Sequence, residues 1–162
     1  SEVAMNAVAA SEVAMNAVTT SGPAMQTIAK LPTSSWSKIK NFIKAINNNQ
    51  TLITNVWDII NNTTYFTYKG TSGQQDAVTN CNSQGTVSYA ANGIIACQLA
   101  SWSSPSASQS TTLWINNENI VTKYASKASS LTRSNVNAIA VPVATFTENG
   151  DGCCIVNVYI SK

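Results

Sequence analysis

The sequence predicts an α+β fold, with helices in the first part of the chain and antiparallel strands in the rest. Three observations support this prediction. A ten-residue unit is repeated at the start, a second segment has apolar residues at helical spacing, and from residue 63 apolar and polar residues alternate. We expect residues 1–62 to form a helical stem and residues 63–162 to form an antiparallel β-sandwich head of jelly-roll type.

The repeat occupies residues 1–30. The segment SEVAMNAV at 1–8 recurs unchanged at 11–18, and the third block keeps the serine, the Ala-Met pair and a β-branched residue. Alanine, methionine and glutamate favour helix, so the first two blocks form either one continuous helix or one short helix each, capped by its serine. Gly22-Pro23 after Ser21 favours a restart. Neither a continuous helix nor separate short helices can bury their own apolar residues, so we expect the blocks to pack against other helices or strands.

Residues 34–62 carry apolar residues at alternating spacings of three and four. The positions are Trp36, Ile39, Ile43, Ile46, Gln50, Ile53, Trp57 and Ile60, of which only Gln50 is polar. Isoleucine at both core positions of a heptad favours trimers and tetramers, so we expect these residues to form the seam of a trimeric coiled coil. The alternative is an amphipathic helix packed on its own domain. Extra apolar residues that widen the stripe favour that alternative, and NNNQT at 47–51 is a candidate break into two helices.

The head is expected to consist of short strands and turns. Asn92-Gly93 lies between two strand-like runs in 86–101 and predicts a two-residue hairpin turn. Residues 103–112 are a serine-rich surface loop by composition, and two further strands flank a turn at Asn116–Asn119. Residues 137–147 and 153–161 are expected to form the closing pair of strands, with Cys154, Val156, Val158 and Ile160 on the core face.

Catalytic chemistry has little support in the sequence. The chain has no histidine, which removes the common nucleophile–base pairs, and its seven acidic residues are not spaced to suggest a shared site. No CxxC pair is present, and Glu148–Gly152 is better explained as a tight turn than as a calcium loop. We therefore expect no enzyme activity, no metal and no cofactor.

Charge and composition narrow the partners. Nine basic and seven acidic residues give a net charge of +2, too small to indicate nucleic acid, and Ser, Thr and Asn make up 57 of the 162 residues. No apolar run approaches the roughly 20 residues that cross a membrane, and no signal peptide is visible, so we expect no membrane insertion. Because the chain starts in register with its own repeat, we expect it to be part of a longer protein.

The four cysteines are Cys81, Cys97, Cys153 and Cys154. We expect all four to be reduced and to pack as small apolar residues. A disulfide between Cys81 and Cys97 is the alternative that stays open.

Surface recognition is the function class that remains. Trp102, beside the serine-rich loop, and Trp114 and Tyr124, in the following strands, are candidate receptor contacts. Tryptophan and tyrosine combine a large apolar area with a polar tip, which suits stacking on a sugar or anchoring a protein. Each of them could equally be a core or inter-subunit residue.

The decad SEVAMNAV, with Ser, Ala-Met and Val in fixed places, resembles the repeat arrays of bacteriophage tail-fibre and related virion appendage proteins. The resemblance covers residues 1–30 by motif and the rest only by architecture. It implies a homotrimeric fibre tip that attaches the virion to a glycan or protein on the host surface, joins upstream fibre or virion proteins, and is assembled in the host cytoplasm. A bacterial trimeric surface adhesin and a purely structural fibre or collar component are the alternatives.

Overall fold

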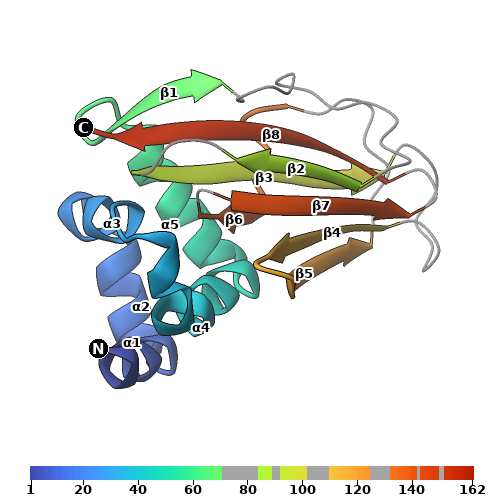
Figure 1. Cartoon of the computed structure of the whole chain (residues 1–162). Coiled ribbons are helices and arrows are strands. Elements are labelled where there is room, and N and C mark those ends of the chain that lie inside the picture. Colours follow the sequence, from blue (N-terminus) through green and yellow to red (C-terminus); the bar gives the residue numbers. More distant parts are fainter. Residues whose placement is uncertain (71–83, 89–91, 102–109, 125–131, 142, 150–151) are drawn as a thin grey trace.

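A computed structural model describes residues 1–70, 84–88, 92–101, 110–124, 132–141, 143–149 and 152–162. These residues combine helices with antiparallel sheets, which confirms the α+β class (Figure 1). The helices are α1 (Glu2–Ala9), α2 (Glu12–Thr19), α3 (Gly22–Ala29), a short 3-10 helix η1 (Thr33–Ser35), α4 (Trp36–Asn47) and α5 (Gln50–Ile60). The strands are β1 (Phe66–Gly70), β2 (Gln84–Ser88), β3 (Gly93–Ser101), β4 (Ser110–Ile115), β5 (Glu118–Tyr124), β6 (Ala138–Ala140), β7 (Val143–Asn149) and β8 (Gly152–Ser161).

Each ten-residue block forms a separate short helix that begins after its own serine. The side-chain oxygens of Ser1, Ser11 and Ser21 each accept a hydrogen bond of 3.2 Å from the backbone N–H three residues later. Such a cap satisfies one of the backbone donors left free at a helix start. The alternative of one continuous helix over the first two blocks is therefore wrong, and the restart at Gly22-Pro23 is confirmed.

The sixth residue of every block is an amide, and each one binds a different part of the layer beneath. The hydrogen bonds run from Asn41 Nδ2 to Asn6 Oδ1 at 2.9 Å, from Asn55 Nδ2 to Asn16 Oδ1 at 3.3 Å, and from Gln26 Nε2 to the backbone oxygen of Tyr65 at 3.0 Å. Asn41 lies in α4 and Asn55 in α5. The repeats thus form an outer layer of helices on a second helical layer.

The third block differs from the other two where it meets the sheets. Position two is glutamate in the first two blocks and Gly22 in the third. A Cβ atom at Gly22 would lie 2.4 Å from ring atoms of Tyr65, far inside van der Waals contact. A side chain at this position, such as the glutamate of the first two blocks, would have to displace the Tyr65 ring.

Replacing Gly22 with alanine is expected to lower the free energy of unfolding by about 1–3 kcal/mol, because the added methyl group must displace Tyr65. On helix propensity alone, the change from glycine to alanine would raise the free energy of unfolding by roughly 0.5–1 kcal/mol. A decrease would therefore show that the contact with Tyr65 outweighs propensity. Urea denaturation measures the change. Glu12→Ala, at the exposed equivalent position of α2, is the matched control and should have a small effect. A more stable Gly22→Ala protein would contradict the close packing.

The heptad segment is two helices rather than one. α4 ends at Asn47 and α5 begins at Gln50, because the Asn49 side chain accepts hydrogen bonds from the backbone N–H groups of Thr51 and Leu52 and so caps a new helix. The prediction of a continuous coiled-coil helix over 34–62 is therefore wrong, and the break that NNNQT suggested is present.

The proposed trimer seam is buried inside the single chain. Ile43, Ile46 and Ile53 have no exposed surface, Ile39 and Ile60 are 3% and 1% exposed, and Trp36 and Trp57 are half-buried. Gln50 is exposed at the start of α5. The seam is wrong because the apolar stripe, widened by Phe42, Leu52 and Val56, is covered by the repeats on one side and the sheets on the other.

In the part of the chain that the structure describes, eight strands form two four-stranded sheets, with strand orders β1-β8-β3-β6 and β2-β7-β4-β5. All described pairs are antiparallel. Strands of the two sheets contact each other, and residues such as Ile95, Cys97, Leu113 and Val156 are fully buried.

Two predicted strand pairs are wrong, and the strand expected over 137–147 is divided into β6 and β7, which lie in different sheets. β2 and β3 flank Asn92 but lie in different sheets, as do β7 and β8. Asn92 does have a positive φ of 75°, but it belongs to a connection that crosses between the sheets. The residues expected on the core face of β8 are buried up to Val158. Its opposite face, with Asn157 and Tyr159, is buried as well.

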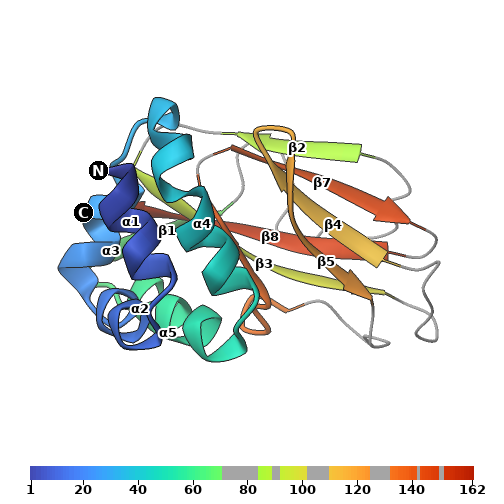
Figure 2. The same ribbon diagram turned by 90° about the horizontal axis from the view of Figure 1, so that it is seen from below.

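The helices cover one end of the two sheets (Figure 2). α4 contacts β5 and β6, and α5 contacts β1 and β6. The buried Asn47 side chain donates to the backbone oxygen of Ile139 and accepts from its N–H, both at 2.8 Å. An amide of α4 thereby occupies the backbone groups at the edge strand β6, where a further strand would otherwise pair.

Candidate functional site

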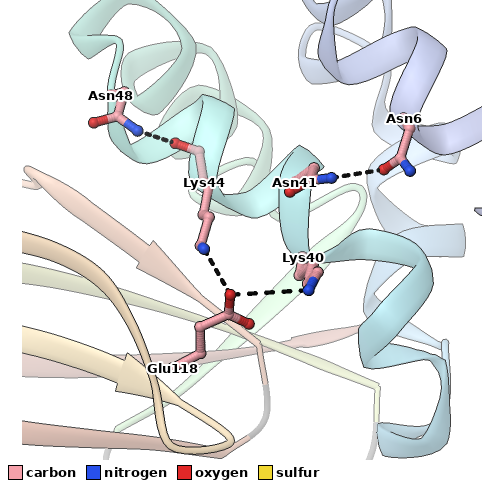
Figure 3. Close-up of polar contacts among 6 residues, drawn as sticks. All are labelled: Asn6, Lys40, Asn41, Lys44, Asn48 and Glu118. Atoms are coloured by element: carbon pink, nitrogen blue, oxygen red, sulfur yellow. Dashed lines mark hydrogen bonds and ion pairs between the residues drawn. The ribbon is translucent and has the colours of Figure 1, made fainter.

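A cluster of charged residues joins α4 to the β4–β5 turn. Lys40 and Lys44 lie one helical turn apart, and both face Glu118 at the start of β5 (Figure 3). Lys44 Nζ is 2.7 Å from Glu118 Oε1, and Lys40 Nζ is 3.9 Å from the same atom. The hydrogen bond from Lys44 lowers the pKa of Glu118 below its ordinary value, and the Trp36 side chain adds a weaker hydrogen bond. The cluster fixes the turn against the helix.

A small pocket opens beside this cluster, where the start of α4 meets the sheets. We call it the Trp36 pocket; its lining residues are Leu31, Pro32, Thr33, Trp36, Ile39, Ile115, Asn116 and Val141. The free space inside is about 20 Å³. That is room for one group of the size of a water molecule, well below the roughly 300–1,000 Å³ of a typical small-molecule site. The pocket can therefore hold a single small substituent of a larger ligand.

The Trp36 pocket has an apolar floor and a polar rim. Ile39, Ile115 and Val141 are 3%, 1% and 9% exposed, whereas Thr33 and Asn116 are exposed. Asn116 has a φ of 49° and Asn117 a φ of 63°, so the predicted turn between the two strands consists of two left-handed asparagines. This turn fixes the position of the Asn116 backbone at the rim of the pocket.

The outer face of β4 and β5 is a second candidate surface. Thr111, Leu113 and Ile115 of β4 are buried, and the alternate residues Thr112 and Trp114 are half-buried on the opposite face. The hydroxyl groups of Thr112 and Thr122 are hydrogen-bonded at 2.9 Å, and the exposed Asn119 is paired with Trp114 across the strands. This face combines an aromatic ring with hydroxyl and amide groups.

The predicted receptor residues are only partly brought together. Trp114 lies in β4, and Tyr124 ends β5, paired with Ser110. Trp102 lies outside the described residues, as do residues 103–109 of the expected loop, while Ser110–Thr112 belong to β4 rather than to that loop. Trp36 was expected in a trimer seam and instead lines the pocket.

Sequence reasoning missed a polar and aromatic cluster on the face of β1 and β8 that carries Tyr68, Asn157 and Tyr159. The guanidinium of Arg133 lies 4.1 Å above the Tyr68 ring, and Tyr68 Oη donates to Asn157 Oδ1 at 3.2 Å. Tyr68 and Trp57 both contact the Tyr159 ring. Among the described residues, no hydrogen-bond partner is found for the Nδ2 group of the fully buried Asn157. No sequence pattern links these residues, which come from four separate segments.

The described cysteines have no feature of a reactive site. Cys97 is a buried free thiol and Cys154 is buried as well, while Cys81, the partner of Cys97 in the alternative disulfide, lies outside the described residues. Burial raises the pKa of the Cys97 thiol, although nearby Lys123 acts in the opposite direction. Desolvation lowers the pKa of Lys123 in turn. Both groups are thus shifted toward their uncharged forms.

Within the described ranges, no group of three or more Cys, Asp and Glu side chains is arranged to hold a metal ion. None of the helices in those ranges is long and apolar enough to cross a membrane.

Comparison with known proteins gives no family. No protein-family model matches the chain, and a search of curated proteins found no match.

Proposed function

We propose that this chain is the tip of a bacteriophage fibre and attaches the virion to a glycan on the host surface. The observation that carries the proposal is the Trp36 pocket, in which an aromatic side chain and an apolar floor lie beside an exposed amide and an exposed hydroxyl. Sugars present apolar C–H faces together with many hydroxyl and amide groups, so a site of this composition suits them. The repeats support the assignment to a fibre, by their resemblance to virion appendage arrays.

We further propose that the two sheets are a jelly-roll sandwich. The support is the pairing pattern, in which β1 pairs with β8, β2 with β7, β3 with β6 and β4 with β5. Such nested pairs arise when one long antiparallel hairpin is rolled into two sheets. Jelly rolls occur in viral capsid and lectin domains, which suits a virion protein that binds glycans.

The proposal does not include catalysis. Glu2 and Glu12 lie on the exposed side of the repeats, Asp58 is exposed on α5, and Glu118 is held by two lysines. A glycosidase needs two carboxyl groups roughly 5–10 Å apart across the substrate. No described contact pairs any of these four carboxylates with another one, so they do not form the carboxyl pair of a glycosidase.

A homotrimer remains part of the proposal, but through a surface other than the heptad residues. Val3 and Val13 are 80% and 81% exposed at the same position of two helices that share their first seven residues. Exposed valines add nothing to the packing of a single chain, so we propose that copies associate over the outer face of α1 and α2. Sedimentation should give a mass near three times 17.1 kDa, and Val3→Glu with Val13→Glu should reduce it.

Attachment is tested by mixing the labelled chain with a panel of bacterial cells and measuring the fraction retained on washed cells. Retention by at least one strain, competed by surface glycan extracted from that strain, is the expected result. Failure to bind any strain would instead favour a structural virion component. Release of oligosaccharide from the extract would contradict a purely binding role. A membrane anchor or secretion signal encoded beside this chain would favour the surface-adhesin alternative.

A further inference from the structure

We infer that the Trp36 pocket takes the N-acetyl group of an amino sugar, and this inference rests on the proposed function. The first argument is size. The free space of about 20 Å³ accepts one group of the size of a water molecule, and a methyl group is of that size. A sugar ring cannot enter, so the ring lies across the mouth while a single substituent is buried.

The second argument is the chemistry of the floor. Ile39, Ile115 and Val141 form an apolar base, and the residues that line the pocket include no charged side chain. A buried ammonium or carboxylate group would lose its hydration without gaining a partner there, so the buried group is uncharged. A methyl group is stabilised by the same surroundings, because its apolar area leaves water.

The third argument is the polar rim. The exposed Asn116 amide can both donate and accept, and the Thr33 hydroxyl can do the same. An acetamido group carries one carbonyl acceptor and one N–H donor directly beside its methyl group. The pocket therefore offers hydrogen-bonding groups next to an apolar methyl site, and the half-buried Trp36 is one of the residues that line it.

Other substituents match only part of this arrangement. The methyl group of a 6-deoxy sugar fits the floor but has no amide to pair with Asn116 and Thr33. A free amino sugar has the N–H donors but brings a charge and no methyl group. The two classes serve as comparison ligands in the test.

The experiment is saturation-transfer difference NMR on the full chain with N-acetylglucosamine, glucosamine, glucose and rhamnose. The acetyl methyl protons of N-acetylglucosamine should receive the strongest saturation, and glucosamine and glucose should bind more weakly. Asn116→Gly keeps a residue that tolerates the positive φ and removes the amide, so affinity for N-acetylglucosamine should fall about 2- to 10-fold. Asn117→Gly, at the neighbouring left-handed position outside the pocket lining, should bind as the unaltered chain does.

Equal binding of rhamnose, saturation confined to ring protons, or equal losses in the two glycine variants would overturn the inference. Cell binding that N-acetylated sugars do not compete would overturn it while leaving the proposed attachment function intact. Failure to bind both cells and sugars would remove the two proposals together.

Discussion

Replacing Asn47 with alanine should lower the free energy of unfolding by about 3 kcal/mol or more. Asn47 is 1% exposed and makes hydrogen bonds with both backbone groups of Ile139 at 2.8 Å and with the backbone oxygen of Ile43 at 2.9 Å. Its removal leaves the N–H and C=O of a fully buried residue without partners, and each such group costs about 1–3 kcal/mol. Alanine has a higher helix propensity than asparagine, so this loss of stability would occur in spite of helix propensity.

Urea denaturation followed by circular dichroism measures the effect. Asn48→Ala is the matched control, because the exposed Asn48 makes one side-chain hydrogen bond to Lys44 within the same helix. The control should change stability by less than about 1 kcal/mol. Similar effects of the two substitutions would contradict the role of Asn47 at the edge of β6.

Replacing Ile43 with alanine should cost about 2–5 kcal/mol, because Ile43 has no exposed surface and truncation leaves a cavity in close-packed surroundings. The mass of the native protein measured by sedimentation should stay unchanged, since Ile43 is covered by its own chain. A seam between chains would behave differently, because the same truncation would weaken association and make stability depend on protein concentration.

Thr51→Ala provides the matched control for Ile43→Ala. It also shortens a β-branched side chain in a helix, but at an exposed position of α5, outside α1 and α2. Its stability should stay within about 0.5 kcal/mol of the unaltered chain. A drop in native mass for Ile43→Ala, without a drop for Thr51→Ala, would restore the heptad seam as an interface.

Several local signals in the sequence were reliable, although Asn92-Gly93 does not form the hairpin that it predicted. The serine before each repeat predicts a helix start, and Ser1, Ser11 and Ser21 all cap helices. The asparagines at 116 and 117 likewise predict a turn, and both have positive φ. These features depend on a few neighbouring residues, so a single sequence carries enough information to identify them.

The sequence did not show whether the apolar stripe of residues 34–62 packs against another chain or against its own chain. Spacing of three and four is satisfied by a coiled coil and by a helix packed on its own chain, and Ile43 and Ile53 fit both. The second stripe of Phe42, Leu52 and Val56 was the available signal for internal packing. Asn47 gave no such signal, because its bonds to Ile139, which is 92 residues away, form only when α4 ends beside the sheet.

Strand pairing and the pocket were beyond sequence reasoning for a related reason. Alternating residues predict strands, but nothing local says that β2 pairs with β7 rather than with β3. The Trp36 pocket combines residues from 31–39, 115–116 and 141, which meet only after the helices dock on the sheets. Sequence analysis named Trp102 and Trp114 as binding candidates, whereas Trp36, which lines the pocket, was assigned to the trimer seam.

The three helical repeats differ in how readily one of them could be gained or lost during evolution. The third repeat has specific contacts with the rest of the chain, because Gly22 makes room for Tyr65 and Gln26 donates to the backbone oxygens of Tyr65 and Lys162. The first two share eight unbroken residues, the kind of duplicated stretch in which misaligned recombination adds or deletes whole units. Such events would change the length of the array at its outer end and leave the anchored helix untouched, so the reach of the protein can vary among descendants while its sheets stay the same.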